Sequence, residues 1–480
     1  MSTAGAPPKL TTQTEIHTGT AQGRWILAAA VLGSGMAFLD GTVVNVALRV
    51  IGQDLDASLA DLQWVVNAYM LTLAALILLG GSMGDRFGRR RIFVIGIVWF
   101  AVASAACALA PTPLVLIVAR AVQGMGGALL TPGSLAMIQS SFCAEDRAKA
   151  IGIWSGLAGA SAAAGPFVGG WLIDVASWRY VFWINGPLAV AVTLIAARHV
   201  PETHDAQAAR SFDIPGAVLG CIGLAGITYA LIEPGHGLRT YLIAAAGLAG
   251  LVAFVVNERA RRAPMVPPSL FASRVFNTSN VLTFVVYGAL GALLFLLTLQ
   301  LQVVSGYSPL QAGVALLPIE VLMLALSGSS GALAARIGPR LQMTAGPALC
   351  AGGALLLLSV DADGSYWTHV LPGIVVFGMG LTALVAPLTA TVLAAAPDRY
   401  AGIASGVNNA VARAGSLLVV AALPVVVGLG GDDYDDPITF GAGYRSAMVI
   451  CAVLLALGGA AGWWGLRRTS EKTLRESERP

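Results

Sequence analysis

Long apolar runs dominate the sequence and restrict it to one class of fold. A helix of about 20 apolar residues crosses about 30 Å of hydrocarbon, and a helix satisfies its own backbone polar groups there. Only 11% of the 480 residues are charged, against about a quarter in soluble proteins. We therefore expect an all-α membrane protein with fourteen transmembrane helices, near residues 25–48, 61–82, 92–111, 113–137, 148–173, 179–198, 212–233, 240–258, 278–304, 309–334, 341–360, 367–395, 402–428 and 443–466.

The basic residues predict how these helices are oriented. With the N-terminus in the cytoplasm, 22 of the 28 Lys and Arg fall in cytoplasmic segments and four in outside segments, as membrane proteins prefer. Their densest cluster lies in Gly81–Arg91, and the acidic Gly431–Asp436 falls outside. Only three of the 28 are lysine, a bias that indicates a high-GC bacterial genome. We expect a multi-pass protein of the bacterial plasma membrane with both termini cytoplasmic.

A short pattern occurs twice and predicts an internal repeat. Gly81-x3-Asp85-Arg86-x-Gly88-x-Arg90 returns 250 residues later, from Gly331 to Arg340, with Ala335 in place of the aspartate. The two copies are eight predicted helices apart, which fits two six-helix halves with two helices inserted between them. Parallel repeats of this kind occur in secondary transporters. The expected division is a cytoplasmic tail, a first half, the inserted helices, a second half and a second cytoplasmic tail, at 1–24, 25–200, 201–262, 263–466 and 467–480.

Two opposite charges are predicted at a similar depth in the membrane. Asp40 lies about 22 Å along the first helix, at 1.5 Å per residue, and Arg120 reaches a similar depth in the antiparallel fourth helix. Ionisable residues inside a membrane are candidates for proton or ion pathways. The alternative is a permanent ion pair that only orients the two helices. Asn45 lies about 140° around the helix from Asp40, so we expect it to make a helix–helix hydrogen bond instead.

Further polar side chains fall inside the predicted spans. Gln123 shares a face with Arg120, consistent with a proton or substrate pathway or with a packing face. Glu320 follows Pro318 in the tenth span, and burial suits a proton carrier or a cation-recognising group there. A locally satisfied glutamate is the alternative. One helical stripe in the thirteenth span is expected to face the central cavity, or else to pack on another helix, with Arg413 paired to Glu320: Ser405, Asn409, Arg413 and Ser416.

A stripe of small residues in the fifth span predicts close helix packing. Ser161, Gly165 and Gly169 recur every four residues and let a neighbouring backbone approach, and Pro166 bends the helix. Gly170 extends the same small-residue surface.

Several functional classes find no support in the sequence. No Gly-x4-Gly-Lys-Ser/Thr phosphate-binding loop occurs, the five histidines lie in loops or at helix ends, and no Thr-Val-Gly-Tyr-Gly filter is present. Four of the five cysteines lie in apolar runs, so we expect neither disulfides nor a cysteine-based metal site. No catalytic constellation, cofactor, metal or nucleic-acid partner is expected.

Five ordered segments resemble the signatures of the major facilitator superfamily, and specifically of its fourteen-span drug:proton antiporters. They are Leu39–Leu48, Gly81–Arg91, Leu116–Gly127, Gly165–Gly170 and Trp178–Pro187. The sequence departs from the family pattern at Arg49, where proline is usual, and at Ser161, where glycine is usual.

The resemblance implies a proton-coupled exporter of small amphipathic drugs or antibiotics that works by alternating access as a monomer in the lipid bilayer. Asp40, Glu320, Arg120 and Arg413 are the expected proton-coupling residues, although the resemblance assigns no role to Glu320. The substrate would contact Gln123, Asn409, Ser405 and Ser416. The alternatives are a proton-coupled exporter of a specific metabolite, such as an amino acid, siderophore or lipid precursor, and a non-transporting membrane sensor. A gate that closes the cytoplasmic side is expected at Gly81, Asp85, Arg86, Gly88 and Arg90.

Overall fold

In the described part of the chain, the fold consists of long helices that run from one end of the molecule to the other. The computed structural model describes residues 16–204, 212–233, 235, 237–261, 264–397 and 400–466. Within these ranges, fourteen helical segments are long and apolar enough to cross a membrane, which confirms the predicted fold class. Helix ends differ from the predicted ones by up to seven residues, because caps decide them. Thr20 caps the first helix, Asp56 ends it in a left-handed conformation, and Asp436 caps the last.

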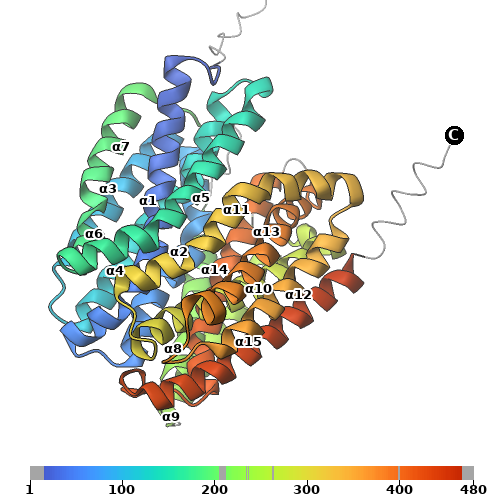
Figure 1. Cartoon of the computed structure of the whole chain (residues 1–480). Coiled ribbons are helices and arrows are strands. Elements are labelled where there is room, and N and C mark those ends of the chain that lie inside the picture. The colour runs from blue at the N-terminus through green and yellow to red at the C-terminus, as the bar shows by residue number, and fades with distance from the viewer. Residues whose placement is uncertain are drawn as a thin grey trace, which may run out of the picture.

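The first seven helices form one bundle, here called the first bundle (Figure 1). Its sixth span is divided at Ile184 into a short and a longer helix. Within the bundle α1 packs against α5 and α7, α4 packs against α2 and α3, and α3 packs against α7. The helices are α1 (Ala21–Leu55), α2 (Leu59–Phe87), α3 (Arg89–Ala108), α4 (Pro113–Ser141), α5 (Ala144–Val175), α6 (Tyr180–Trp183) and α7 (Asn185–His199).

The last six spans form a second bundle with the same packing pattern. Here α10 packs against α14 and α15, α13 packs against α11 and α12, and α12 packs against α15. Each pairing matches one in the first bundle, as two related halves would show. The helices are α10 (Arg274–Val303), α11 (Pro309–Ile337), α12 (Arg340–Leu356), α13 (Leu371–Ala394), α14 (Ala401–Val426) and α15 (Pro437–Gly465), with short helical turns at η1 (Pro268–Ala272), η2 (Leu357–Ser359), η3 (Tyr366–Val370) and η5 (Asp433–Asp435).

The repeated sequence pattern occupies equivalent places in the two bundles. Gly88 ends α2 with φ +106°, and Gly338 ends α11 with φ +82°. L side chains rarely adopt such positive φ angles, so both turns favour glycine. The pattern thus marks the same sharp turn in both copies, which explains why glycine recurs although Asp85 does not.

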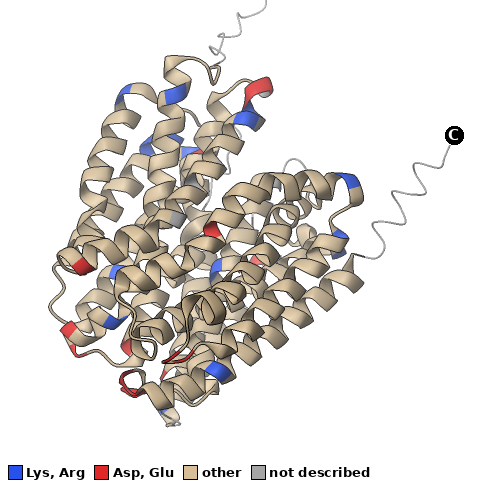
Figure 2. Ribbon diagram, viewed as in Figure 1, with Lys and Arg blue, Asp and Glu red and all other residues tan. Residues whose placement is uncertain are grey.

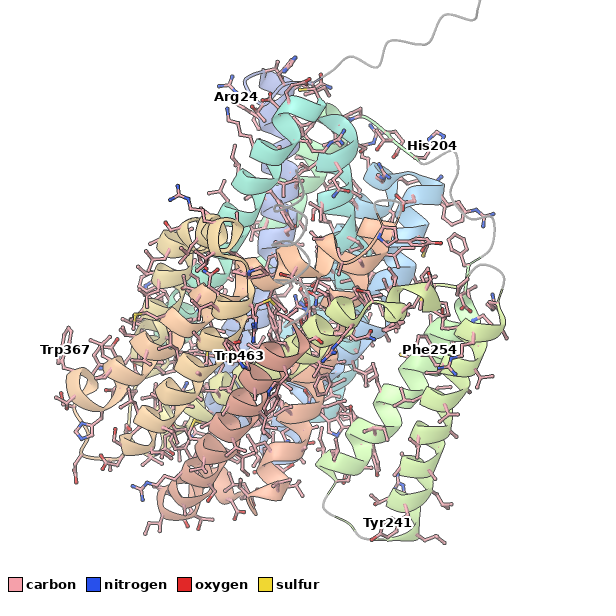
Figure 3. All side chains as sticks on the ribbon, turned by 90° about the vertical axis from the view of Figure 1, so that its right-hand side faces the viewer. Arg24, His204, Tyr241, Phe254, Trp367 and Trp463 are labelled. Carbon is pink, nitrogen blue, oxygen red and sulfur yellow. The ribbon has the colours of Figure 1, made fainter. Side chains whose placement is uncertain are left out.

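Two helices lie between the bundles in sequence and form a hairpin at their side. Helices α8 (Ile214–Ile232) and α9 (Leu238–Ala260) pack closely on each other, and α8 contacts both α2 and α14. Figure 3 shows this pair standing at one side of the protein, with Tyr241 at one end and Phe254 farther along. The hairpin therefore covers the line where α2 of the first bundle meets α14 of the second.

The two ends of the molecule differ in charge (Figure 2). By the helix bounds, one end carries Arg24, Arg89, Arg198 and Arg340 and is here called the basic end; the opposite, acidic end carries Asp54, Asp61, Asp174 and Asp432 to Asp436. The bundles meet near the acidic end and diverge toward the basic end (Figure 1).

Hydrogen bonds join the bundles at the acidic end. The Gln302 side chain donates to the Val46 carbonyl at 2.9 Å, and the Gln63 side chain donates to the Val420 carbonyl at 2.7 Å. The Tyr434 hydroxyl donates to the Ala57 carbonyl at 2.7 Å. Burial, aided by Asp435, raises the pKa of Tyr434 to about 12, so this hydroxyl remains a donor at physiological pH. These three hydrogen bonds join the bundles through neutral side chains.

Close backbone contact between α5 and α11 also closes the acidic end. Gly313 of α11 lies against the Pro166 carbonyl of α5, and Gly170 lies against Leu310. A side chain at position 313 would push the helices apart, whereas Gly328, farther along α11, has open space around it.

We predict that Gly313→Val opens the acidic end and that Gly328→Val does not. Overpacking costs about 1–3 kcal/mol, which shifts a conformational equilibrium by about 5- to 150-fold. Spin labels at Gln53 and Asp432, both exposed at the acidic end, measure the change by double electron–electron resonance. A distance distribution unchanged in Gly313→Val, or changed equally in the control, would contradict the prediction.

Candidate functional site

A buried ion pair lies inside the first bundle. Arg120 Nη1 is 2.5 Å from Asp40 Oδ2, and both side chains are at most 2% exposed. Arg120 Nε also donates to the Val65 carbonyl at 3.1 Å, and the guanidinium lies over the Tyr69 ring at 4.4 Å from its centroid. The structure therefore brings together the two charges that the sequence places at one depth.

Neutral side chains complete the hydrogen bonding of this ion pair. Gln123 Nε2 donates to Asp40 Oδ1 at 2.8 Å, and its Oε1 accepts from Arg120 Nη1 at 2.5 Å. Asn185 Nδ2 donates to the same Asp40 oxygen at 3.1 Å. Gln123 Nε2 and Asn185 Nδ2 also donate to Ser104 Oγ, at 2.7 and 3.1 Å respectively. Partners for Asp40 thus come from α3, α4 and α7, directly or through Ser104, while Val65 adds α2.

This network is arranged around the charge of Asp40. While ionised, Asp40 accepts hydrogen bonds from Arg120, Gln123 and Asn185. A proton on Asp40 would remove the charge that Arg120 compensates and would replace an acceptor with a donor. The network joins α1 to four other helices, α2, α3, α4 and α7.

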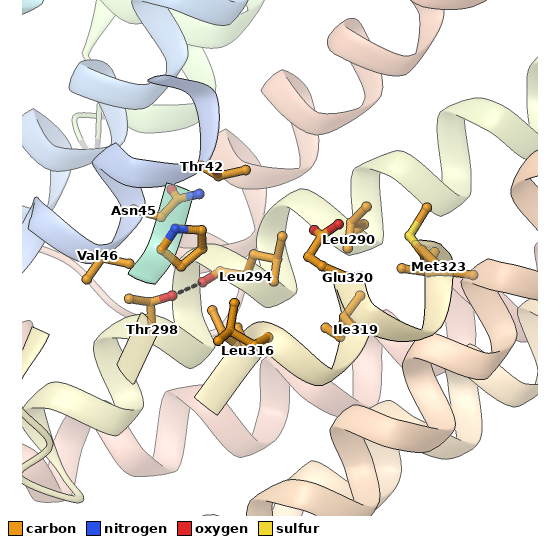
Figure 4. A pocket seen from close by; sticks show the side chains of 13 residues that line it. Thr42, Asn45, Val46, Leu290, Leu294, Thr298, Leu316, Ile319, Glu320 and Met323 are labelled. Atoms are coloured by element: carbon orange, nitrogen blue, oxygen red, sulfur yellow. Dashed lines mark hydrogen bonds between the residues drawn. The ribbon is translucent and has the colours of Figure 1, made fainter. Parts of the chain in front are cut away.

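A separate cavity lies between the two bundles (Figure 4). Figure 4 shows Glu320 of α11 among apolar side chains such as Leu290 and Met323, with Thr42 and Asn45 of α1 facing it. The lining comes from α1, α5, α10, α11 and α13: Thr42, Asn45, Val46, Pro166, Leu290, Leu294, Thr298, Leu316, Leu317, Ile319, Glu320, Met323 and Leu381. Glu320 is half-buried, and among the described residues no hydrogen bond or ion pair reaches its carboxylate.

The expected pairing of Glu320 with Arg413 is wrong. Arg413 lies on α14 and donates to the sulfur of Met70 in α2 at 3.8 Å, which is not a charge partner. Glu320 faces the cavity formed with α1, α5, α10 and α13. The two residues have similar depth, but their side chains point to different neighbouring helices.

The expectation for Asn45 is also wrong. Asn45 lines the cavity beside Glu320, and the described residues offer it no helix–helix hydrogen bond. It does face away from Asp40, as its position around α1 predicted. A helix–helix hydrogen bond of α1 is made by Thr42 instead, whose hydroxyl donates to the Ala162 carbonyl of α5 at 3.1 Å.

The residues predicted to contact substrate lie outside this cavity. Gln123 is fully buried in the Asp40 network. On α14, Ser416 packs against Gly291 of α10, Ser405 is half-buried and Asn409 is exposed. Neither α4 nor α14 contributes to the lining, whereas α5, α10 and α13 do.

The small-residue stripe of α5 packs on helices of both bundles. Ser161 lies against Gly35, Gly165 against Thr42 and Gly169 against Val43, all on α1. Pro166 and Gly170 face α11. The stripe therefore joins α1 to α5 on one side and α5 to the second bundle on the other.

The residues expected to form a gate lie at the basic end, on α2, on α3 and at the turn between them. Asp85 pairs with Arg89 at 2.8 Å, one turn along the chain, and Arg86 lies over the Phe212 ring at 4.9 Å. Glu202 accepts from the backbone N–H groups of Arg90 and Arg91, at 3.1 and 3.2 Å. Gly88 lies against this carboxylate and Gly81 against Pro132.

Sequence reasoning missed three of these contributors. Asn185 lies within the Trp178–Pro187 signature but received no role, although a polar side chain there was a usable signal. Ser104 and Glu202 carried no such signal, because one is an isolated serine in an apolar run and the other lies in a loop. Only the helix arrangement shows that they complete the network and the basic-end contacts.

We predict that Arg120→Gln destabilises the protein far more than Arg179→Gln. Arg179 pairs with Asp54 at 2.7 Å, but these side chains are 35% and 44% exposed. Breaking a buried pair costs about 3–5 kcal/mol, and losing an exposed pair costs about 0–1 kcal/mol. Thermal unfolding in detergent compares the two variants. Equal loss in both would contradict the structural importance of the buried pair.

The chain is similar to bacterial antibiotic-resistance proteins. It is 37% identical to the puromycin resistance protein pur8 of Streptomyces alboniger over 84% of this chain and 81% of that protein. It is 35% identical to the tetracenomycin C resistance and export protein of Streptomyces glaucescens, over 84% and 75%. It is also 35% identical to the methylenomycin A resistance protein of Bacillus subtilis, over 90% and 92%.

Solved transporters share the fold at low sequence identity. The peptide transporter PepTSo2 superimposes with a TM-score of 0.68 over 94% of this chain and all of that chain, at 15% identity.

The profile of the Major Facilitator Superfamily matches residues 30–420, most of the chain. The protein belongs to the Major Facilitator Superfamily, a family of transporters rather than enzymes, as a multi-pass membrane protein closely related to bacterial drug and antibiotic resistance exporters.

Proposed function

We propose that the protein is a proton-coupled exporter of small amphipathic drugs or antibiotics. The observation that carries this proposal is the fully buried Asp40–Arg120 ion pair with its Gln123 and Asn185 partners. When a carboxylate in an apolar bundle is paired with a single cation, binding of a proton to the carboxylate would weaken the pair and change how the helices pack. The similarity to a puromycin resistance protein and to a tetracenomycin C resistance and export protein supports export of toxic compounds.

The arrangement of the bundles supports transport by alternating access. They are joined at the acidic end and apart at the basic end (Figure 1). We place the basic end in the bacterial cytoplasm, since cytoplasmic segments carry the excess of Lys and Arg. In this conformation the protein would be open to the cytoplasm, where the substrate of an exporter binds. A monomer would suffice, with halves at 25–200 and 263–466 moving about the inserted hairpin.

The proton gradient would supply the driving force through Asp40. Each proton that enters along a membrane potential contributes about 2.3 kcal/mol per 100 mV. Protonation would release Arg120 and loosen the contacts of α1 with α4 and α7. The bundles could then separate at the acidic end and close at the basic end. Asp40 has no exposed surface here, so its proton would arrive only when another conformation opens the network.

We predict that Asp40→Asn abolishes substrate-induced proton release in everted membrane vesicles. Asparagine keeps the size and part of the hydrogen bonding but cannot accept the transported proton. Asp54→Asn is the matched control, because Asp54 is exposed and paired with Arg179 at the acidic end. Full proton release in Asp40→Asn would remove Asp40 from the coupling mechanism.

Glu320 would recognise the cationic group of a substrate. Its carboxylate lies in an apolar cavity and has no partner among the described residues. A cation bound there would therefore be attracted by a negative charge that no other group compensates. The surrounding leucines and Met323 would accept the apolar part of an amphipathic molecule.

We predict that Glu320→Gln lowers the affinity for cationic substrates about tenfold or more, since a charge-assisted contact contributes about 1.5–3 kcal/mol. Neutral substrates should bind as before. Equilibrium binding of a cationic and a neutral dye to purified protein measures this, with Glu145→Gln at the exposed start of α5 as control. An equal loss for both dyes would argue against a charge-recognising role.

The basic-end gate would act only on the rate of conformational change. Asp85 is 40% exposed and is not among the residues that line the cavity. We predict that Asp85→Asn slows transport while substrate affinity stays within about twofold, since exposed pairs contribute about 0–1 kcal/mol. Transport rate and equilibrium binding on the same preparation separate the two effects. A large loss of affinity would show that Asp85 belongs to the binding site.

A further inference from the structure

A cluster of three metal-ligating side chain types lies at the basic end, away from the ion pair and the cavity. His17 precedes α1, and Cys143 and Asp146 lie at the start of α5. His17 Nδ1 is 3.3 Å from Cys143 Sγ and 3.4 Å from Asp146 Oδ2. All three ligand atoms lie within 4.8 Å of one another.

The backbone holds these residues together independently of their side chains. Ile16 pairs with Phe142 in a parallel β-bridge, and the Cys143 N–H donates to the Ile16 carbonyl at 3.2 Å. The Thr18 N–H donates to Asp146 Oδ2 at 2.8 Å. The segment before α1 is thereby fixed against the start of α5, so the three side chains converge on a framework that does not depend on an ion.

Two groups approach His17 Nδ1, the Cys143 thiol and the Asp146 carboxylate. Nδ1 either donates its one proton or accepts one from the thiol, and Asp146 Oδ2 also accepts from Thr18. A metal ion in place of that proton would bind nitrogen, sulfur and oxygen at once.

The two separations measured from His17 Nδ1 match those of a tetrahedral ion of the zinc class. With Zn–N near 2.0–2.1 Å, Zn–S near 2.3 Å and Zn–O near 2.0–2.2 Å, a tetrahedral site separates N from S by about 3.5 Å and N from O by about 3.4 Å. The observed separations are 3.3 and 3.4 Å. The donor set of imidazole, thiolate and carboxylate suits zinc better than the all-oxygen sites of magnesium or calcium.

We propose that His17, Cys143 and Asp146 form a binding site for a divalent transition-metal ion of the zinc class. Three protein ligands leave one tetrahedral position for water, and the 57% exposure of the His17 side chain gives the ion access. Hydrogen bonds from Thr18 orient the Asp146 carboxylate. The ion would fasten the segment before α1 to α5 at the rim where the bundles diverge, within the first bundle alone.

Cobalt(II) titration of the purified full-length protein, free of any histidine tag, tests the site. Co²⁺ replaces Zn²⁺ in tetrahedral sites and reports a thiolate ligand by a sulfur-to-cobalt charge-transfer band. We expect one Co²⁺ per chain, the charge-transfer band, and displacement of Co²⁺ by Zn²⁺. Absence of tight one-to-one binding in the unmodified protein would overturn the proposal.

Variants distinguish this site from other thiols. Cys143→Ser should remove the charge-transfer band, and His17→Ala should weaken binding by more than about tenfold. Cys221→Ser, which changes a half-buried cysteine on α8, should leave both unchanged. Size-exclusion chromatography checks the fold of each variant, and Asp146→Asn replaces any that aggregates. A band that persists in Cys143→Ser, or is lost in Cys221→Ser, would also overturn the proposal.

Discussion

The Asp40–Arg120 ion pair is the interaction on which the first bundle depends. A single charge at the centre of a bilayer costs about 2.5–3.5 kcal/mol on insertion scales, and pairing Asp40 with Arg120 offsets part of this cost for both residues. Gln123, Asn185 and Ser104 occupy the remaining hydrogen-bonding positions, and the Val65 carbonyl holds the guanidinium. Helices α1, α2, α3, α4 and α7 are thus constrained by one polar centre inside an otherwise apolar bundle.

The second bundle treats its interior charges differently. Glu320 and Arg413 lie on α11 and α14, and within the described part of the chain neither takes part in an ion pair. The related packing of the bundles therefore does not extend to their chemistry. The first bundle compensates its charges internally, while the second leaves a carboxylate facing the cavity between them. That asymmetry is what we expect if one half responds to protons and the other contacts substrate.

Closure at the acidic end has a different physical basis from the ion pair. It rests on backbone carbonyls, the Gln302 and Gln63 side chains, and glycines that let α5 and α11 touch. Such contacts are short-ranged and numerous, so the proposed alternating access would exchange them for another set. At the basic end, charged groups form ion pairs that do not join the two bundles, such as Asp85 with Arg89 and Arg90 with Glu202.

The sequence by itself determined the number of spans, the repeat and the depth of each polar residue. Apolar run length fixes which segments can cross a bilayer, and a helix rises by a constant 1.5 Å per residue. Depth alone brought Asp40 and Arg120 together correctly, yet it paired Glu320 with Arg413 wrongly. Only the tertiary structure decides which neighbouring helix a side chain faces, because that depends on how the helices pack and not on their spacing in sequence. The same reason hid the contact of Asn45 with the cavity, and the meeting of His17 with Cys143 across 126 residues.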